Sequence, residues 1–162
     1  MTALIAYFFT ALLISFICSL LESVLLSVSR AHIAVLIKEG KSRGKVMASL
    51  KENINRPLSA ILTINTIANT FGAAGVGAQT YSVFGSGWVG LSSFILTFSI
   101  LFFSEIIPKT LGANYTKSLV GFTAYVIKGL MFIVFPMVIV GEKISNLFNK
   151  NDNDSSKDSR EE

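Results

Sequence analysis

The sequence has little of what soluble enzymes and secreted domains are built from. Its 162 residues include one cysteine, one histidine, one tryptophan and three prolines, and only 15% of them are charged. The lone cysteine, Cys18, excludes an intrachain disulfide, and one histidine with one cysteine cannot make a zinc cluster. The sequence shows no nucleophile and base pair and no phosphate-cradling loop, so we do not expect an enzyme.

Apolar residues take the place of these missing types. Hydrophobic residues make up 51% of the chain, and the mean hydropathy is +0.60. A membrane-crossing helix needs about 20 apolar residues. We therefore predict an all-α integral membrane protein, surrounded by the lipid bilayer, with three transmembrane helices at 2–29, 57–79 and 89–107. The first stretch has no basic residues before it, so we expect it to be retained rather than cleaved as a signal peptide.

A fourth apolar stretch, 118–141, is ambiguous because Lys128 lies in its middle and Pro136 and Gly141 interrupt it. It either crosses the bilayer or lies along the membrane surface as a bent juxtamembrane helical belt. We favour the belt, since Lys128 is easier to place near lipid headgroups than at mid-membrane. The prediction is a membrane domain at 1–148 and a disordered polar tail at 149–162.

The basic residues are concentrated in one connector. Between Arg30 and Arg56 lie seven lysines and arginines against two glutamates. This asymmetry places the connector in the cytoplasm by the positive-inside rule, with the amino terminus outside and the carboxy terminus inside a multi-pass cell membrane. No nucleic-acid-binding motif accompanies the basic run, so we do not expect nucleic acid as a partner. We expect one or two short helices here, with breaks at Gly40 and Gly44.

Polar residues recur at helical spacing inside the predicted spans. In the first span, serines fall four residues apart, and Glu22 lies on the same side; in the second, Asn65 and Asn69 share a face. The serines are Ser15, Ser19, Ser23 and Ser27. Helix packing explains such residues without any ligand, because serine and asparagine commonly bond across membrane helices.

Glu105 is the only residue between Pro57 and Pro108 whose side chain is charged at neutral pH. A charge in the hydrocarbon layer costs roughly 2.5–3.5 kcal/mol, so it is normally paired, hydrated or functional. Pro108 has no N–H, which leaves the carbonyl of Ser104 without its helical partner. A carboxylate beside a free carbonyl suits a cation, although a helix that simply ends at the surface, with Glu105 reaching water, also explains the pattern.

Three segments together carry a resemblance to a known family. Glu22 to Arg30, Asn65 to Asn69 and Glu105-Ile-Ile-Pro-Lys109 resemble the CNNM/CorC (cyclin M) transmembrane domain, whose signature is Glu-x-x-Pro-Lys. The resemblance implies a homodimer that transports Mg²⁺, generally as export coupled to Na⁺. It also implies that Ser19, Ser23, Asn69 and Glu105 coordinate the ion, with Asn65 beside them.

Two features depart from the family pattern. Ser104 stands where the family usually has glycine, and the chain ends in a charged tail where members usually continue into nucleotide-binding CBS domains. We therefore expect either a stand-alone or truncated member without CBS domains, or a member for which a separate cytoplasmic partner supplies regulation. The alternative to a sodium-coupled magnesium exporter is a non-transporting membrane scaffold or sensor that dimerises through its polar helix faces.

Overall fold

The computed structural model describes residues 1–136, and every regular element in that part is helical. The elements in chain order are α1 (Thr2–Ser27), α2 (Arg30–Lys38), α3 (Ser42–Glu52), α4 (Asn55–Phe84), η1 (Ser86–Trp88), α5 (Val89–Ser99), η2 (Ile100–Ile106) and α6 (Ile107–Asn114). An unlabelled helix, Thr116–Pro136, follows them. The all-α prediction is confirmed. The predicted tail at 149–162 lies outside the described residues.

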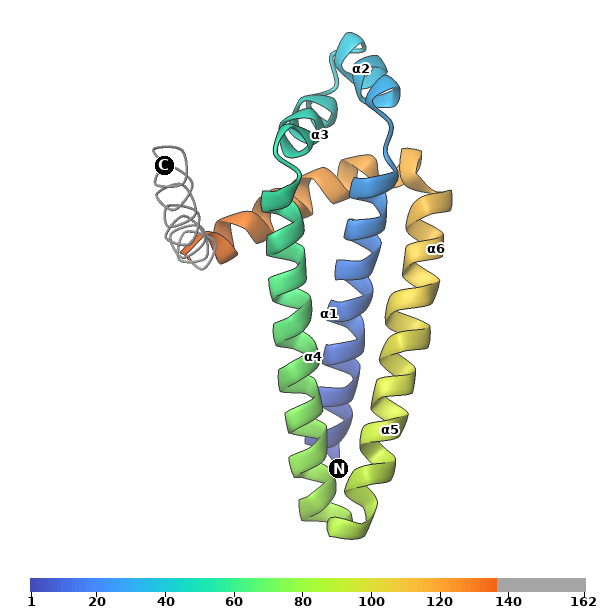
Figure 1. Cartoon of the computed structure of the whole chain (residues 1–162), viewed down its shortest axis with the longest axis vertical. Helices are drawn as coiled ribbons and strands as arrows, with labels where there is room; N and C mark the ends of the chain where they lie inside the picture. Colours follow the sequence, from blue (N-terminus) through green and yellow to red (C-terminus); the bar gives the residue numbers. More distant parts are fainter. Residues whose placement is uncertain (137–162) are drawn as a thin grey trace, which may run out of the picture.

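Three long helical columns run side by side (Figure 1). The column of α1 packs against α4 on one side and against η2 and α6 on the other. Glycines permit this close approach: a side chain at Gly72 would collide with Ala11, and a Cβ at Gly112 would lie 2.8 Å from the Cβ of Ser23. The polar stripe of α1 is therefore enclosed between its two neighbours.

Length and composition alone select a different set of three helices as membrane spans. The helices apolar enough to cross a membrane are Thr2–Ser27, Ser86–Asn114 and Thr116–Pro136, and α4 is not among them. Asparagines, threonines and glycines dilute the apolar character of α4. Yet α4 has 30 residues, or about 45 Å of helix, and it lies alongside α1, whereas Thr116–Pro136 runs across the ends of the columns (Figure 1). This arrangement matches the predicted three crossings with a belt. The predicted interruption at Gly141 falls outside the described residues.

The third column is continuous from Val89 to Asn114, whereas the sequence predicted that this helix ends at 107, before Pro108. Instead of ending, the helix changes its backbone hydrogen-bond pattern over Ile100–Ile106. In η2 the helix is of the π type, and the N–H of Ile107 donates to the carbonyl of Phe102, five residues back. Pro108 then falls in the first turn of α6, where a missing N–H costs little. A π segment within a membrane helix is often a mark of a functional site.

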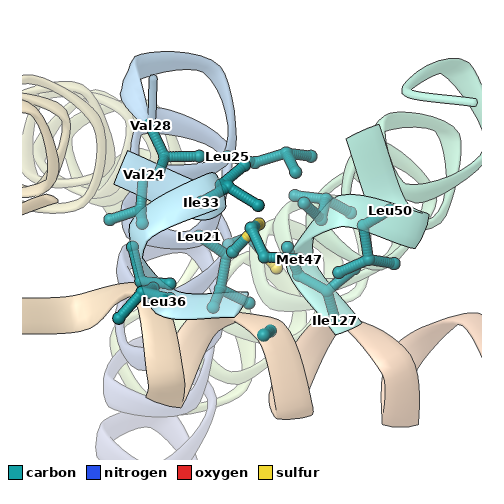
Figure 2. Close-up of a cluster of buried hydrophobic side chains, with 13 residues drawn as sticks. Leu21, Val24, Leu25, Val28, Ile33, Leu36, Met47, Leu50 and Ile127 are labelled. Atoms are coloured by element: carbon teal, nitrogen blue, oxygen red, sulfur yellow. The ribbon is translucent and has the colours of Figure 1, made fainter. Parts of the chain in front are cut away.

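The hydrophobic core of the described part lies at one end of the columns. Leu21 and Leu25 of α1 meet Met47 of α3 and Ile127 of the last helix in one buried cluster, shown in Figure 2. Because its apolar face is buried there, the last helix lies across the bundle. The connector forms two helices as predicted, and Gly40, with φ of 73°, separates them. Gly44 is not a break: it lies inside α3 and is buried against Leu36.

Candidate ion-binding site

The serine stripe of α1 faces the neighbouring columns. Ser15, Ser19 and Ser23 are 0%, 2% and 9% exposed, whereas Ser27, at the end of the helix, is exposed. A helix this apolar could present any face to lipid, so burial of the hydroxyl face is a consequence of packing against α4 and α6. The hydroxyls are thus held inside the protein at three successive turns.

The two amides of α4 are enclosed as well. The side-chain oxygens of Asn65 and Asn69 are buried, and neither has a hydrogen-bond partner among the described residues. The hydroxyl oxygen of Ser15 is also buried and also lacks a hydrogen-bond partner among the described residues. An unsatisfied buried polar group costs about 1–3 kcal/mol, and native proteins contain few of them. These three oxygens could serve as ligands of a bound cation. A fourth unpartnered oxygen of α4, on Thr80, lies about three turns from Asn69.

The register of α1 and α4 aligns these oxygens. The two helices are antiparallel (Figure 1), and Gly72 packs on Ala11. About one turn further along α1 is Ser15, and about one turn back along α4 is Asn69, so both lie at nearly the same level. One more turn brings Ser19 to the level of Asn65 by the same argument.

Hydrogen bonds set the level of the third column. The hydroxyl of Ser104 donates to the carbonyl of Leu12 (2.9 Å), and the hydroxyl of Ser23 donates to the carbonyl of Lys109 (2.6 Å). These bonds hold η2 and α6 against α1, one directly before the signature and one at its last residue. Glu105 follows Ser104 directly, so its backbone lies near the level of Ser15, and its side chain is partly buried.

The two carboxylates of the membrane columns differ in their surroundings. The carboxylate of Glu22 lies 3.6 Å from the ammonium of Lys109. Within residues 1–136, no such salt bridge involves Glu105. No group of three or more histidines, cysteines, aspartates or glutamates occurs in that part of the chain either. The candidate site is therefore made of hydroxyl, amide and single-carboxylate oxygens, which suit hard cations such as Mg²⁺ rather than zinc.

Sequence reasoning missed three features of this region. It noted Ser15 in the stripe but left it out of the candidate ligands, although its buried hydroxyl lacks a partner. It treated the Ser104 side chain only as a departure from glycine, whereas that hydroxyl ties η2 to α1. The pairing of Glu22 with Lys109 was also missed; opposite charges at the same end of two neighbouring columns were the available signal.

Comparison with known proteins shows what the chain as a whole is similar to. Residues 5–162 match the family described as the cyclin M transmembrane N-terminal domain. A UPF0053 protein of Synechocystis is 34% identical over 148 residues, which cover 91% of this chain and 43% of the relative. The UPF0053 inner membrane protein YfjD of Escherichia coli is 25% identical over 72% of this chain and 27% of its own length.

A more distant relative carries a functional name. The metal transporter cnnm-2 of Caenorhabditis elegans is 28% identical over 76% of this chain, which corresponds to 16% of that protein. The chain thus spans less than half the length of these curated relatives. The family match, residues 5–162, includes the helix segments that carry the polar faces described above.

Proposed function

This chain belongs to the cyclin M (CNNM) transmembrane-domain family, and on that premise we propose that it is a divalent-cation transporter domain that exports Mg²⁺ in exchange for Na⁺. It is a multi-pass membrane protein by its fold and family. The name of the nematode relative, a metal transporter, supports the class of activity. That name specifies neither Mg²⁺ nor Na⁺, and both ions are part of what we propose.

One observation carries the proposal: the side-chain oxygens of Asn65 and Asn69 are buried and have no hydrogen-bond partner in the described part of the chain. By the helix register argued above, these residues are level with the serines of α1. We assign Glu105 as the counter-charge and Ser19, Ser23, Asn65 and Asn69 as neutral oxygen ligands. Ser23 can take part while its hydroxyl donates to Lys109, because a hydroxyl oxygen keeps lone pairs that accept.

A single carboxylate sets the strength of binding. Mg²⁺ prefers about six oxygen ligands at 2.0–2.1 Å and gives up its water reluctantly. Four neutral ligands and one charge hold such an ion less tightly than a cage of carboxylates, and transport requires release as well as binding. A homodimer would supply the second subunit against which the exposed helix faces move.

The proposal is tested by calorimetric titration of Mg²⁺ into the detergent-purified protein, followed by Mg²⁺ flux in vesicles with and without a Na⁺ gradient. Glu105→Gln keeps the side-chain shape and removes the counter-charge, so it should abolish both binding and flux. Glu52→Gln removes the same charge from the exposed face of α3 and should leave both unchanged.

If Glu105→Gln inserts and folds yet transports Mg²⁺ at the wild-type rate, the proposed site is wrong. If the folded wild type binds no Mg²⁺ at millimolar concentration, the polar faces are packing surfaces and the scaffold or sensor reading replaces transport. If Mg²⁺ flux does not depend on the Na⁺ gradient, only the proposed coupling to Na⁺ is wrong.

A further inference from the structure

Two charged groups of the membrane columns have no role in the proposed transport site. They are the carboxylate of Glu22 on α1 and the ammonium of Lys109 on α6, which lie 3.6 Å apart. The columns α1, α4 and Val89–Asn114 contain two further charged residues, Glu105 of the candidate site and Arg56 at the start of α4. Because charges are costly in or near the hydrocarbon layer, the position of the pair requires an explanation.

Glu22 lies on α1 between two of the assigned ligands, three residues after Ser19 and one residue before Ser23. It is seven residues beyond Ser15, or about 10 Å further along the helix toward the connector (Figure 1). The backbone of Glu105 lies near the level of Ser15, as argued above. A cation that moves along α1 between Glu105 and the connector end therefore passes the level of Glu22.

The backbone at Lys109 is held in place, whereas its side chain is loosely held. The hydroxyl of Ser23 donates to the carbonyl of Lys109 (2.6 Å), and Gly112, three residues later, packs closely on Leu20 and Ser23. The side chain of Lys109 is 51% exposed, and that of Glu22 is 24% exposed. Their separation of 3.6 Å exceeds the roughly 2.7–3.2 Å of an N–H···O hydrogen bond, so the contact is an ion pair without a hydrogen bond.

Such a pair is weak enough to be exchanged. An ion pair with an exposed partner contributes little to stability, because water solvates the separated charges nearly as well. At equal distance and dielectric constant, Mg²⁺ interacts with a carboxylate about twice as strongly as an ammonium group does, because it carries twice the charge. The carboxylate of Glu22 is partly buried, so its interactions are screened less than those of a surface group. A divalent cation can therefore compete with Lys109 for this carboxylate.

We propose that Glu22 is a second cation-binding residue on the path between Glu105 and the connector end, and that Lys109 neutralises it until a divalent cation displaces the ammonium group. The proposal rests on the proposed transport of Mg²⁺ and adds a group that the ion meets beside the assigned ligands. Because Lys109 is tethered to α6, its ammonium returns when the ion leaves, so Glu22 binds the ion only transiently. An ion path must bind the ion and also release it.

The first test needs no substitution. The lysines of the whole chain in detergent are modified with a water-soluble N-hydroxysuccinimide ester, with and without Mg²⁺ at constant ionic strength, and mass spectrometry gives the rate at each lysine. Displacement by Mg²⁺ should raise the rate at Lys109 up to about fivefold, the most that an ion pair of this kind withholds. Lys117, exposed at the start of the next helix, is the internal reference and should not respond. An unchanged rate at Lys109 in saturating Mg²⁺ would contradict the exchange.

The second test measures Mg²⁺ affinity by calorimetry. Lys109→Gln should bind Mg²⁺ about fivefold more tightly than the wild type, because the competing charge is gone. Lys109→Arg keeps the charge and should bind as the wild type does, and Lys117→Gln is the matched control. The gain must depend on Glu22: in a Glu22→Gln background, Lys109→Gln should leave the affinity unchanged. A purely structural salt bridge would alter the unfolding midpoint of the single variants and leave their Mg²⁺ affinity as it is.

The proposal is wrong if Lys109→Gln raises the affinity equally with and without the Glu22 carboxylate, since the lysine would then act on Glu105 through its electric field. Failure of the exchange is distinguishable from failure of the proposed function. If the wild type binds Mg²⁺, Glu105→Gln does not, and Lys109→Gln binds with wild-type affinity, only the exchange is wrong. If Mg²⁺ raises the modification rate at Lys109 but Glu105→Gln transports at the wild-type rate, the exchange is supported and the assignment of Glu105 is wrong.

Discussion

At the scale of single residues, the buried amide oxygens of α4 are the most informative feature. Asn65 and Asn69 each present a side-chain oxygen that is removed from water and not compensated by a protein donor. Such a group lowers the free energy of unfolding. Under the proposed function, a cation that binds these oxygens would offset this cost.

This reasoning predicts the effect of replacing one amide. Asn69→Leu removes an unsatisfied buried oxygen and adds apolar surface, so the metal-free protein should unfold at an equal or higher temperature than the wild type. The increase of the unfolding midpoint that Mg²⁺ produces should disappear, because one ligand is lost. Thermal unfolding with and without Mg²⁺ measures both effects.

Thr70→Val serves as the control for this experiment, because Thr70 is the next residue of α4 and is exposed. It should leave the response to Mg²⁺ intact. A marked loss of stability in metal-free Asn69→Leu would mean that the amide is a packing element, and the ligand assignment would have to be withdrawn.

At the scale of elements, the approach of α1 to α6 depends on a residue without a side chain. A Cβ at Gly112 would lie 2.8 Å from the Cβ of Ser23 and 3.0 Å from the carbonyl oxygen of Leu20. The contact with Ser23 is closer than packed carbon atoms tolerate. The contact with Leu20 is tight as well, and it is to backbone, which cannot turn away. The hydrogen bond from Ser23 to Lys109 forms only because the two helices meet at this distance.

Gly112→Ala should therefore destabilise the protein by about 1–3 kcal/mol, as overpacking of a filled interface does. Gly77→Ala is the matched change at a glycine of α4 whose Cβ would meet nothing within 4 Å. That variant should be neutral or slightly more stable, because alanine favours helix over glycine by about 1 kcal/mol. Denaturant or thermal unfolding of both variants provides the comparison, and equal stabilities would contradict the close-contact argument.

At the scale of the whole molecule, the charge distribution predicts orientation. The basic residues of the connector lie at the end of the columns that carries α2 and α3, and the turn at the opposite end, 85–88, has no charge (Figure 1). The positive-inside rule therefore predicts that the connector is cytoplasmic and that the turn is outside. The same prediction puts the amino terminus, which lies next to the turn, outside.

Labelling with a membrane-impermeant maleimide in intact cells tests this orientation. Ser86→Cys in the turn should react from outside, and Ser42→Cys in α3 should react only after the membrane is opened; both serines are exposed. The background carries Cys18→Ser, although Cys18 is buried. The opposite labelling pattern would reverse the orientation, and with it the direction assigned to transport.

The sequence by itself determined the class of the protein. Its composition and long apolar stretches indicated membrane helices, and the basic charge of the connector indicated a polar segment between two of them. The motif around Glu105 carried the resemblance that the family match confirms. These properties are local, because they depend on residue type and on spacing along one helix. The assignment of Ser19, Ser23, Asn65, Asn69 and Glu105 as ligands stays a prediction, as do the domain limits at 148.

Only the tertiary structure decided which polar atoms are enclosed and which helices lie side by side. Hydropathy alone would have taken Thr116–Pro136 as a crossing and left α4 out, and it is the burial of Ile127 against α1 and α3 that turns the last helix across the bundle. Similarly, the register change at η2 could not be read from Pro108. The physical reason is that burial and partner satisfaction depend on contacts between residues far apart in the chain, which spacing within one segment does not encode.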